Sequence, residues 1–525
     1  MDWTSWSKNM QTTEVEFTIP QESGEVFCYP RVHEFENMAR ENAELLSGSA
    51  LRIADTPLAE LRRQARARVL QKAAAWTARL HIDAPSTPTN ALLFATGHQP
   101  FLFHPGIWIK HLLVSRLASQ GVAAVSIPVD SDACEEIGAD VPVLDGGLRR
   151  IHETLVQAPP DVPYEAQPAP ELTSWQAFLG RLEAALRTLD EPEVESAFHR
   201  FTDTASHVPP VDDIGAFLTM VRRRHEGPRR YLEIPASHVS RTPEFLRFFL
   251  AILRDSPRFA ETYNRHLDAY RERHNVRTAA QPFPNLERDA ARVELPFWVT
   301  SGGKRHSMYA ERRDKTWKVG TREGVSVMLA DGDGPDRLER IEIRPKALTL
   351  TAFTRLFVAD LFVHGVGGGR YDRVTDAVIA DYFGIRSPRY AVVTATLHLP
   401  LHSHNTDAER QRLQRRLLEI QHNPERALAS PSLEQQRLID EKWRHIRSLD
   451  SSALTRRERR QITQRIRDIN ESLSQELARE RADAELRLRS LVDAPEADAA
   501  ARYRGYPFCF FPPQSIDALI DNLGV

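Results

Sequence analysis

The sequence predicts an α/β protein with a parallel sheet and a helical arm towards its C-terminal end, and three features carry this prediction. Residues 91–129 follow a strand, helix and strand pattern. An apolar run at 389–399 has the character of a further strand of the same sheet. Beyond residue 405, helix-start signatures replace the strand pattern. A chain of 525 residues is too long to fold around one hydrophobic core of ordinary size, so we expect two or three folding units.

The composition is typical of a globular protein that works in water. Charged residues make up 27% and hydrophobic residues 41%, and the net charge of -3 favours neither nucleic acid nor a membrane as partner. The first residues lack a basic start before an apolar stretch, and no segment offers about 18 uncharged apolar residues in a row. We therefore expect a cytoplasmic protein. The three cysteines have no C-x-x-C spacing, which argues against a disulfide framework or a zinc finger.

The first 400 residues are expected to hold an N-terminal helical region, 1–90, and a sheet-bearing core, 91–400. In the core we predict a strand at 91–95, a helix at 106–119 ended by Gly121, and a strand at 122–129. Such a unit forces a right-handed parallel crossover. Ligands of parallel sheets bind outside the carboxyl ends of the strands, which is where the two motifs "TGHQP" and "DSDACEE" fall.

Residues 145–336 have a mixed signal, and we interpret them as an insertion within the α/β core. Helices are expected around 175–189 and 243–253, and strands at 231–237, 292–300 and 325–330. The apolar run 348–363 predicts a helix that stops at Gly365, and a second helix is expected at 372–383 with Gly384 as its stop. The sheet is then expected to resume at 389–399.

Residues 401–500 are predicted to form an antiparallel helical arm. Three pairs fit the capping box that marks a helix start: Thr406 with Glu409, Ser432 with Gln435, and Thr455 with Glu458. A coiled-coil seam with alternating gaps of four and three is formed by Ile462, Ile466, Ile469 and Leu473. The arm carries charges of both signs, which favours a solvated face over nucleic-acid binding. The apolar tail, 501–525, is expected to dock onto the body.

The stretch "TGHQPFLFHPG" places a tight turn and a helix start directly after a strand. Backbone donors and the positive end of a helix would meet there, an arrangement that suits an anion. His98 and His104 would stand beside it and could bind phosphate or donate to a developing charge. A role as turn residues bonded to backbone is an equally good interpretation of both histidines.

The stretch "PVDSDACEEI" gathers Asp130, Asp132, Glu135 and Glu136 directly after an apolar strand. So many carboxylates repel one another unless an amine, a metal ion or an arginine lies near, and such clusters shift pKa values in ways that suit proton transfer. The alternative is that Glu135 and Glu136 are ordinary residues of a first helical turn. Cys134 lies within the same stretch and is either reactive or simply packed.

A third candidate is the glycine loop in "FVHGVGGGRYD", between two predicted helices. A glycine loop before a helix can cradle an anion or a nucleotide, although neither known glycine fingerprint is present and a flexible connection is the simpler interpretation. Arg344, Lys346 and Arg370 add cationic side chains that can hold carboxylate or phosphate. Further on, His398, His402 and His404 could form a zinc site, but a plain linker before the arm is favoured.

These blocks together resemble the BshC family, the cysteine-adding enzymes of bacillithiol synthesis. "TGHQPFLFHPGIWIKHLLVSRLASQG", "VSIPVDSDACEEI" and "IRPKALTLTAFTRLFVADLFVHGVGGGRYD" follow in the family's order ahead of a helical arm. The resemblance implies a Rossmann-like core related to class I aminoacyl-tRNA synthetases, with a connecting insertion and a coiled-coil arm used in dimerisation. It also implies amide formation between the carboxyl of cysteine and the amine of glucosaminyl-malate.

The match departs from the family pattern at several positions, which indicates a divergent member. His98 stands where the family has Gln, His104 and Pro105 stand where it has Gly-Gly, and Gly368 stands at the family's glutamate. The acidic stretch also lacks the family's histidine. The positions that match better are Gly97, Gln99, Pro100, Glu135, Glu136, Arg344, Pro345, Gly365, Gly367 and Tyr371.

We therefore expect a carboxylate–amine ligase of the BshC kind, acting on cysteine and an amino-sugar conjugate or on a related amino acid and amine. The expected catalytic residues are His98, Asp130, Asp132 and Glu135. The expected substrate or nucleotide ligands are Gly97, Gln99, Pro100, His104, Gly106, Arg344, Gly365, Gly367, Gly368, Arg370 and Tyr371. ATP or ADP, with magnesium, is the expected cofactor, and we expect no protein-bound metal. The alternative is a non-catalytic dimer that binds a nucleotide or metabolite.

Overall fold

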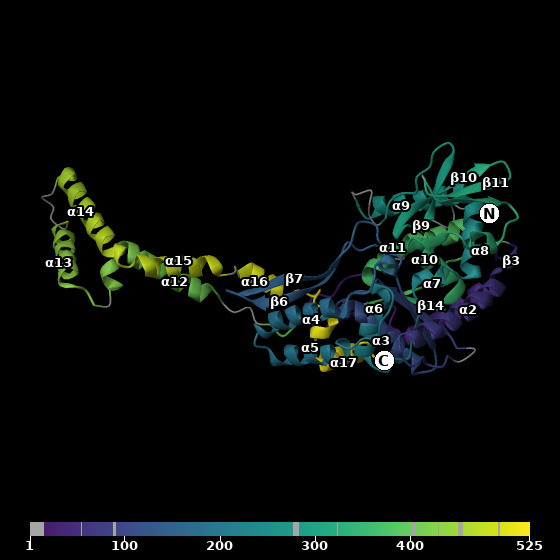
Figure 1. Ribbon diagram of the computed structural model, residues 1–525, viewed down its shortest axis with the longest axis horizontal. Coiled ribbons are helices and arrows are strands. Elements are labelled where there is room, and N and C mark those ends of the chain that lie inside the picture. The colour runs from purple at the N-terminus through teal and green to yellow at the C-terminus, as the bar shows by residue number, and fades with distance from the viewer. Residues whose placement is uncertain are drawn as a thin grey trace.

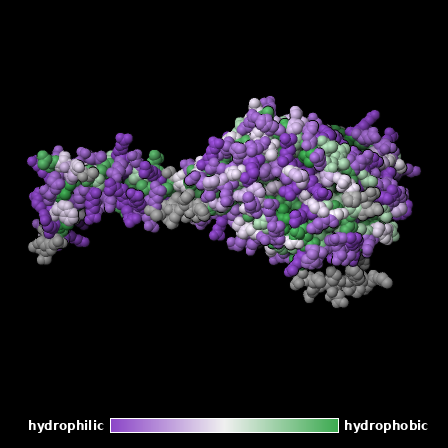
Figure 2. Space-filling view, turned by 90° about the horizontal axis from the view of Figure 1, so that it is seen from below, coloured by the Kyte–Doolittle hydropathy of each residue, from purple (hydrophilic) through white to green (hydrophobic). Residues whose placement is uncertain are grey.

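The computed structural model describes residues 15–53, 55–87, 91–276, 283–322, 324–401, 406–428, 430–449, 455–491 and 494–525. The chain folds into a body that carries two sheets and an arm of helices that projects from it (Figure 1). The space-filling view shows the same two parts, and its hydrophobic side chains are scattered among hydrophilic ones on both (Figure 2).

The main sheet has six strands, and all but β1 run parallel. Their order is β1 (Val26–Tyr29), β15 (Ala391–Ala395), β14 (Leu361–His364), β4 (Leu93–His98), β5 (Ala123–Pro128) and β8 (Leu232–Glu233). The predicted strand, helix and strand unit is confirmed as β4, α3 (Pro105–Ala118) and β5, and Gly121 follows α3 in the left-handed region. These strands are apolar along their length because helices cover both faces of the sheet.

The order of the strands reverses next to β4. From β4 the chain moves to β5 and then to β8 on one side, whereas β14 and β15 lie on the other side. Both β4 and β14 end at the same edge of the sheet, and their loops leave in opposite directions. A crevice at such a reversal is where open parallel sheets bind their ligands.

The predicted helix 348–363 is wrong in its second half. The helix α10 (Ala347–Phe353) runs into a π-helical turn at Thr354–Val358, after which the chain enters β14. Between the helical part and β14, Asp360 joins the chain to its neighbours, since its carboxylate accepts the backbone N–H of Leu93, at 2.7 Å, and a bond from Arg62, at 2.5 Å. A short strand buried on both faces has no alternation of polar residues, so periodicity could not separate it from the helix before it.

The helix after the glycine loop, α11 (Val366–Tyr382), begins six residues earlier than predicted. The glycines therefore form its first turn, and the loop connects a strand to a helix. This excludes the interpretation of a flexible helix–helix connection. The expected stop is confirmed, because Gly384 follows the helix with φ of +69°.

The predicted insertion supplies β8 of the main sheet and most of a second, antiparallel sheet. That sheet has the order β12 (Ser326–Ala330), β11 (Thr316–Gly320), β10 (Lys304–Arg313), β9 (Arg292–Ser301) and β13 (Glu342–Pro345). The remaining strands form the hairpins β2 (Arg52–Ile53) with β3 (Thr56–Pro57) and β6 (Glu136–Leu144) with β7 (Leu148–Gln157). Because Glu136 opens β6, the first-turn helix position considered for Glu135 and Glu136 is wrong. We expected the main sheet to take up its next strand at 389–399, but two earlier segments, β8 and β14, already belong to it.

Helices cover the main sheet on both faces. One face packs against α3, α4 (Leu172–Arg187), α5 (Pro192–Ala205), α6 (Ile214–Glu226) and the C-terminal tail. The other packs against α2 (Leu58–Arg79), α8 (Pro243–Arg254), α9 (Ser256–Arg273), α10 and part of α11. The body also holds α1 (Phe35–Ser47) and the one-turn helix α7 (Ala236–Val239). The predicted N-terminal helices are thereby present, although the edge strand β1 was not expected.

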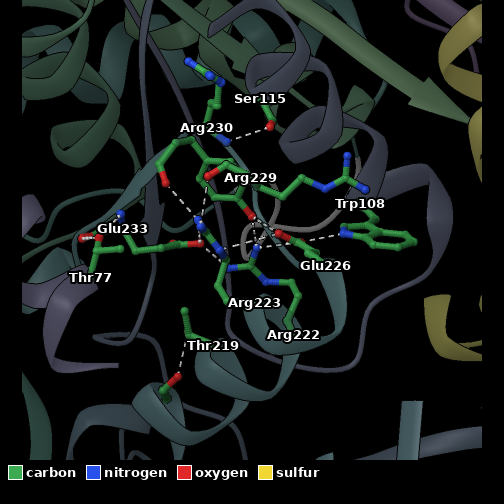
Figure 3. A network of polar contacts seen from close by, with 12 residues as sticks. Thr77, Trp108, Ser115, Thr219, Arg222, Arg223, Glu226, Arg229, Arg230 and Glu233 are labelled. Atoms are coloured by element: carbon green, nitrogen blue, oxygen red, sulfur yellow. Dashed lines mark hydrogen bonds and ion pairs between the residues drawn. The ribbon is translucent and has the colours of Figure 1, made fainter. Parts of the chain in front are cut away.

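A buried network of charges ties α3 to α6 and β8 (Figure 3). Arg222 and Arg223 on α6 face the carboxylates of Glu226 and Glu233, at distances from 2.6 to 3.7 Å. Trp108 of α3 donates its ring N–H to Glu226 at 2.6 Å. Because every charge in the network meets an opposite one, its burial is compensated.

The arm consists of α12 (Thr406–His422), α13 (Leu433–Ser448), α14 (Arg456–Gln475) and α15 (Ala478–Ser490). The helix α12 lies beside α15 next to the body, and α13 lies beside α14 at the far end (Figure 1). The capping boxes at Ser432 and Thr455 are confirmed, whereas the Thr406 side chain lies outside the described residues. Within the expected seam, Ile469 and Leu473 are buried. The coiled coil itself stays a prediction.

The tail docks onto the body, as its composition predicts. The helix α16 (Ala494–Ala501) packs against β7, and α17 (Pro513–Asp521) packs against α3. Between them, Phe508 and Cys509 are fully buried, and the Phe508 N–H donates to the carbonyl of Phe103 at 2.9 Å. The tail therefore reaches the segment that leads from β4 into α3.

Candidate functional site

A cavity of about 760 Å³ lies at the carboxyl ends of β4 and β14, where the strand order reverses. It is lined by the loop after β4, the glycine turn of α11 and part of the second sheet. Among the predicted site residues it brings together Gly97, His98, Gln99, His104, Gly106, Asp132, Gly365, Gly367, Gly368 and Tyr371. The two glycine-containing motifs are thus two walls of one site, although more than 250 residues separate them in the chain.

The loop after β4 is fixed by close backbone contacts. A side chain at Gly97 would bring its Cβ within 2.5 Å of the Ile127 carbonyl oxygen, and one at Gly106 would come within 2.2 Å of the Ala395 carbonyl oxygen. Both positions therefore require glycine for packing. The second contact also joins the start of α3 to β15.

The first turn of α3 does not offer the free amides that the sequence led us to expect. His104 is its N-cap, and its Nδ1 accepts the N–H of Gly106 at 3.1 Å. The N–H groups of Ile107 and Trp108 donate to the His104 carbonyl, at 2.9 and 3.1 Å. Proline at position 105 has no N–H to give. The expected anion cradle at this helix start is therefore not formed by backbone donors, and any anion here must be held by side chains.

The two histidines of this motif are held neutral. Burial, with a smaller contribution from Lys110, lowers the pKa of His98 to about 3. Burial, with contributions from Arg504 and Lys110, lowers the pKa of His104 to about 3. Both rings are therefore neutral hydrogen-bonding groups at neutral pH, and neither adds positive charge to the cavity.

The acidic stretch is divided between two cavities. Asp132 faces the main cavity, where it accepts bonds from Gln99 at 2.9 Å and from Arg305 at 2.6 Å. Asp130 turns away into a smaller cavity of about 320 Å³, where it accepts the backbone N–H of Ser237 at 2.9 Å. Glu135 is exposed at the surface and lines neither cavity. The expected cluster of carboxylates in one pocket is therefore not formed.

Burial and the nearby carboxylate of Glu165 raise the pKa of Asp130 to about 7. Glu165 itself forms a two-pronged ion pair with Arg344, at 2.6 and 2.8 Å. Arg344 is only 1% exposed and does not line the main cavity, so its expected role as an anchor for a substrate carboxylate is not supported. Its charge is already matched by Glu165.

Two further expected ligands lie outside the cavity. Arg370 donates both of its bonds to the carbonyl of Phe17, at 3.0 and 2.6 Å, and so holds the N-terminal segment against α11. Pro100 is buried beside Gly215 of α6. Each is used in packing, and neither lines the main cavity.

The glycine turn of α11 holds a buried histidine at the edge of the cavity. A Cβ at Gly368 would lie 2.8 Å from Nδ1 of His364, so glycine there allows the ring to approach. Nε2 of His364 lies 2.9 Å from Asp372, which is paired with Arg355 at 2.5 Å. Burial lowers the pKa of His364 in spite of this carboxylate. The chain from Arg355 through Asp372 fixes the orientation of the histidine ring.

Several lining residues were missed by sequence reasoning. Among them are Lys110 and His364 near the strand ends, Arg305 and Trp298 of the second sheet, and Arg504 of the tail, whereas Lys346, which the sequence did single out, lines the cavity as well. Lys110 gave a signal, since it is a lone charge among apolar residues of "GIWIKHLLV". Arg305 and Arg504 gave none, because only the folded chain brings them to the cavity.

No cluster of three histidine, cysteine or acidic side chains that could hold a metal ion occurs among the described residues. His398 lies outside the cavity, and His402 and His404 lie outside the described residues. Cys134 is half-buried, and its thiol donates to the carbonyl of Glu136 at 2.8 Å.

No protein-family model matches the chain, and no curated protein matches it. Within the described part of the chain, no helix is both long enough and apolar enough to cross a lipid bilayer. The fold and the site define a mixed α/β protein with a cavity of about 760 Å³ where the strand order of its main sheet reverses.

Proposed function

We propose that the chain is a carboxylate–amine ligase related to the BshC family, with a Rossmann-like core. The observation that carries the proposal is the cavity at the carboxyl ends of β4 and β14, because residues of all three blocks of the family resemblance line it. The order of the parallel strands, from β8 through β4 to β15, supports the Rossmann-like assignment, since that fold reverses at the same point. We further propose that the protein acts in the cytoplasm, as a dimer joined through the arm.

The residues of the cavity suit the holding of an amine beside a carboxyl group. Asp132 is the one carboxylate among the described residues that line the cavity, and beside its pairing with Arg305 it can hold an ammonium group. His98, neutral and facing the cavity, can accept a hydrogen bond from the N–H of the amine as it attacks the carboxyl carbon, while the proton that the amine loses passes to water. His364, whose Nε2–H donates to Asp372, leaves Nδ1 as an acceptor for an N–H or O–H group of the substrate.

The cavity also fits a nucleotide. The first turn of α11 has no side-chain cap at Gly365, and Gly367 lines the cavity beside it. The backbone N–H groups of this helix start can therefore donate to phosphate oxygens. Trp298 and Tyr371 give flat apolar surface to a base. When bound, ATP would supply the activation that amide formation from a free carboxylate needs. The residues that would hold it are those of the α11 turn and the cations of the cavity wall.

A non-catalytic binding protein is the second candidate, and one observation favours it. Asp130 and Glu135, two of the four expected catalytic residues, lie outside the main cavity. Asp132 remains there but is already paired with Arg305. A protein that only binds a nucleotide or metabolite would need the cavity and its cations but no general base.

The deciding experiment is a mass-spectrometric assay of the purified protein with cysteine, glucosaminyl-malate, ATP and magnesium. The ligase proposal expects the cysteinyl amide together with AMP or ADP, and it expects the product to disappear in the Asp132→Asn variant. Asp130→Asn is the matched control, since Asp130 faces the smaller cavity, and its product should persist. Absence of product from protein that still binds ATP would favour the binding protein.

A further inference from the structure

The buried cations of this protein follow a pattern with one exception. The buried lysines and arginines among the described residues are Arg62, Lys110, Arg222, Arg223, Arg344, Arg355 and Lys442. All of them except Lys110 face a carboxylate: Asp360 for Arg62, Glu226 and Glu233 for the pair in Figure 3, Glu165 for Arg344, Asp372 for Arg355, and Glu425 for Lys442. Lys110 donates only to the backbone carbonyl of Gly97, at 3.0 Å.

Lys110 lines the main cavity, so its unmatched charge is directed to the place where a ligand would bind. It is 2% exposed, and burial alone lowers its pKa to about 7. An unpaired buried charge is costly, and proteins neutralise or pair such charges. A buried lysine without a carboxylate is therefore a destabilising feature unless a bound anion supplies the missing charge.

Arg504 brings a second unmatched cation to the same cavity. Its guanidinium donates to the hydroxyl of Thr394 at 3.1 Å and to the carbonyl of Ala395 at 2.7 Å, and its Nε has no partner. Among the described residues no carboxylate pairs with it. A Cβ on Gly106 would lie 2.5 Å from Nη2 of Arg504 and 3.0 Å from Cε1 of His104, so Arg504 and His104 lie side by side at the start of α3, the helix that also carries Lys110.

The other cations of the cavity differ from these two. Arg305 is paired with Asp132 at 2.6 Å, and Lys346 is paired with Glu294 at 2.7 Å. Both also lie over the ring of Trp298. The unmatched positive charge is therefore confined to the end of the cavity that lies next to His104.

We propose that Lys110 and Arg504 form an anion-binding subsite at the His104 end of the cavity, which takes a phosphate or carboxylate group of the ligand. A tail residue thus completes a site whose other parts come from β4 and α3. The subsite does not require catalysis, and it rests on the proposed ligase function only for the identity of the anion, which is a nucleotide phosphate or a substrate carboxylate.

The subsite makes a specific prediction for pH. The charged and titratable groups that face Lys110 are His98, His104, His111 and His364, and burial lowers the pKa of each. Burial thus favours the neutral form of each ring, so the positive charge of the subsite comes from Lys110 and Arg504, of which Lys110 has its pKa near neutrality. In the protein without a bound anion the pKa of Lys110 is about 7, so the affinity for the anion reaches its full value at pH values well below 7, where Lys110 is charged. It falls by up to about tenfold for each further pH unit, since binding must then take up a proton.

The test is calorimetric titration of the full-length protein with sulfate from pH 6 to pH 9, because sulfate does not change its own charge in this range. We expect binding at pH 6 that weakens above pH 7. Lys110→Met and Arg504→Met should each weaken it at least tenfold at pH 6. Lys110→Arg should keep the binding and remove its pH dependence, since arginine stays charged throughout.

Lys442→Met is the matched control, since Lys442 is a buried lysine of the arm that pairs with Glu425. Its sulfate affinity should equal that of the wild type. Lys110→Met should also unfold no more readily than the wild type in sulfate-free buffer, because it removes an unmatched buried charge. Failure of the wild type to bind sulfate at pH 6, or undiminished binding by folded Lys110→Met, overturns the proposal.

Competition then distinguishes the sources of the anion. Displacement of sulfate by ATP and inorganic phosphate, but not by malate, assigns the subsite to a phosphate group. The reverse result assigns it to a carboxylate. Because these measurements need no turnover, a negative ligase assay leaves them unaffected, and the two proposals fail separately.

Discussion

Replacing Glu226 by glutamine tests whether the network of Figure 3 holds α3 in place. The change keeps the size of the side chain but removes the charge that lies between Arg222 and Arg223. Glu233 would then be the sole carboxylate for two buried guanidinium groups. Trp108 would also lose the charged acceptor of its ring N–H, which lies 2.6 Å away in the wild type.

The expected loss of stability is about 3–5 kcal/mol, the range found when one partner of a buried ion pair is removed. Burial alone would raise the pKa of Glu226, but Arg222 and Arg223 lower it below its ordinary value of 4.5. The contribution of Glu226 is therefore complete above pH 4.5 and is lost as the pH falls through the lowered value. The difference between wild type and variant should be largest at neutral pH and shrink in acid.

Native-state hydrogen exchange of the α6 and β8 amides measures this difference locally, without the assumption that a chain of this size unfolds in one step. Exchange should rise roughly a hundredfold or more at pH 7. Glu183→Gln is the matched control, because it breaks a pair with Arg187, at 2.6 Å, in which the Arg187 and Glu183 side chains are 65% and 40% exposed. Its effect should stay within about 1 kcal/mol. Equal effects of the two variants would refute the reasoning.

Three further predictions follow from the same structure. Gly106→Ala should destabilise the protein by about 2 kcal/mol or more, because the new Cβ would clash with buried atoms. Gly365→Ala should change thermal stability little, because a Cβ there meets nothing within 4 Å. Asp130→Asn should gain stability over the wild type as pH rises from 4 to 7, because the buried carboxyl with its pKa near 7 loses its contribution over that interval; a constant difference in urea titrations would contradict this. Leu418 and Leu486 of the arm are exposed, so their replacement by glutamate should weaken the dimer that we propose at least tenfold in sedimentation experiments, and an unchanged dimer would exclude these two residues from its interface.

The parts of the fold that the sequence predicted correctly are those with a local chemical signature. The unit around α3 was found because glycine and proline mark its turns and because its strands are short apolar runs. The capping boxes at Ser432 and Thr455 satisfy backbone donors within one turn, so the residues that form them are visible in the sequence. The strand β14 was missed because an apolar run can continue from helix to strand without a change of composition.

The candidate site was predicted only where single motifs line it. The turn after β4 and the glycine turn of α11 were both found, and both are walls of the cavity. Asp130 was placed wrongly because the sequence does not give the direction of side chains in a loop, and two neighbouring acidic residues face different cavities. Arg344 was expected to be free for a substrate, but its partner, Glu165, is distant in the sequence.

The position of Arg504 shows why such a site depends on the whole chain. Holding a half-buried guanidinium without a carboxylate is unfavourable, so the segment that carries it must be fixed by other contacts. Phe508 and Cys509, which follow four and five residues later, are fully buried and supply these contacts through the hydrophobic effect. The Phe508 N–H bond to Phe103 fixes the tail next to the residue that caps α3. The apolar composition of the tail, which predicts docking, is thus also what holds its charge at the cavity.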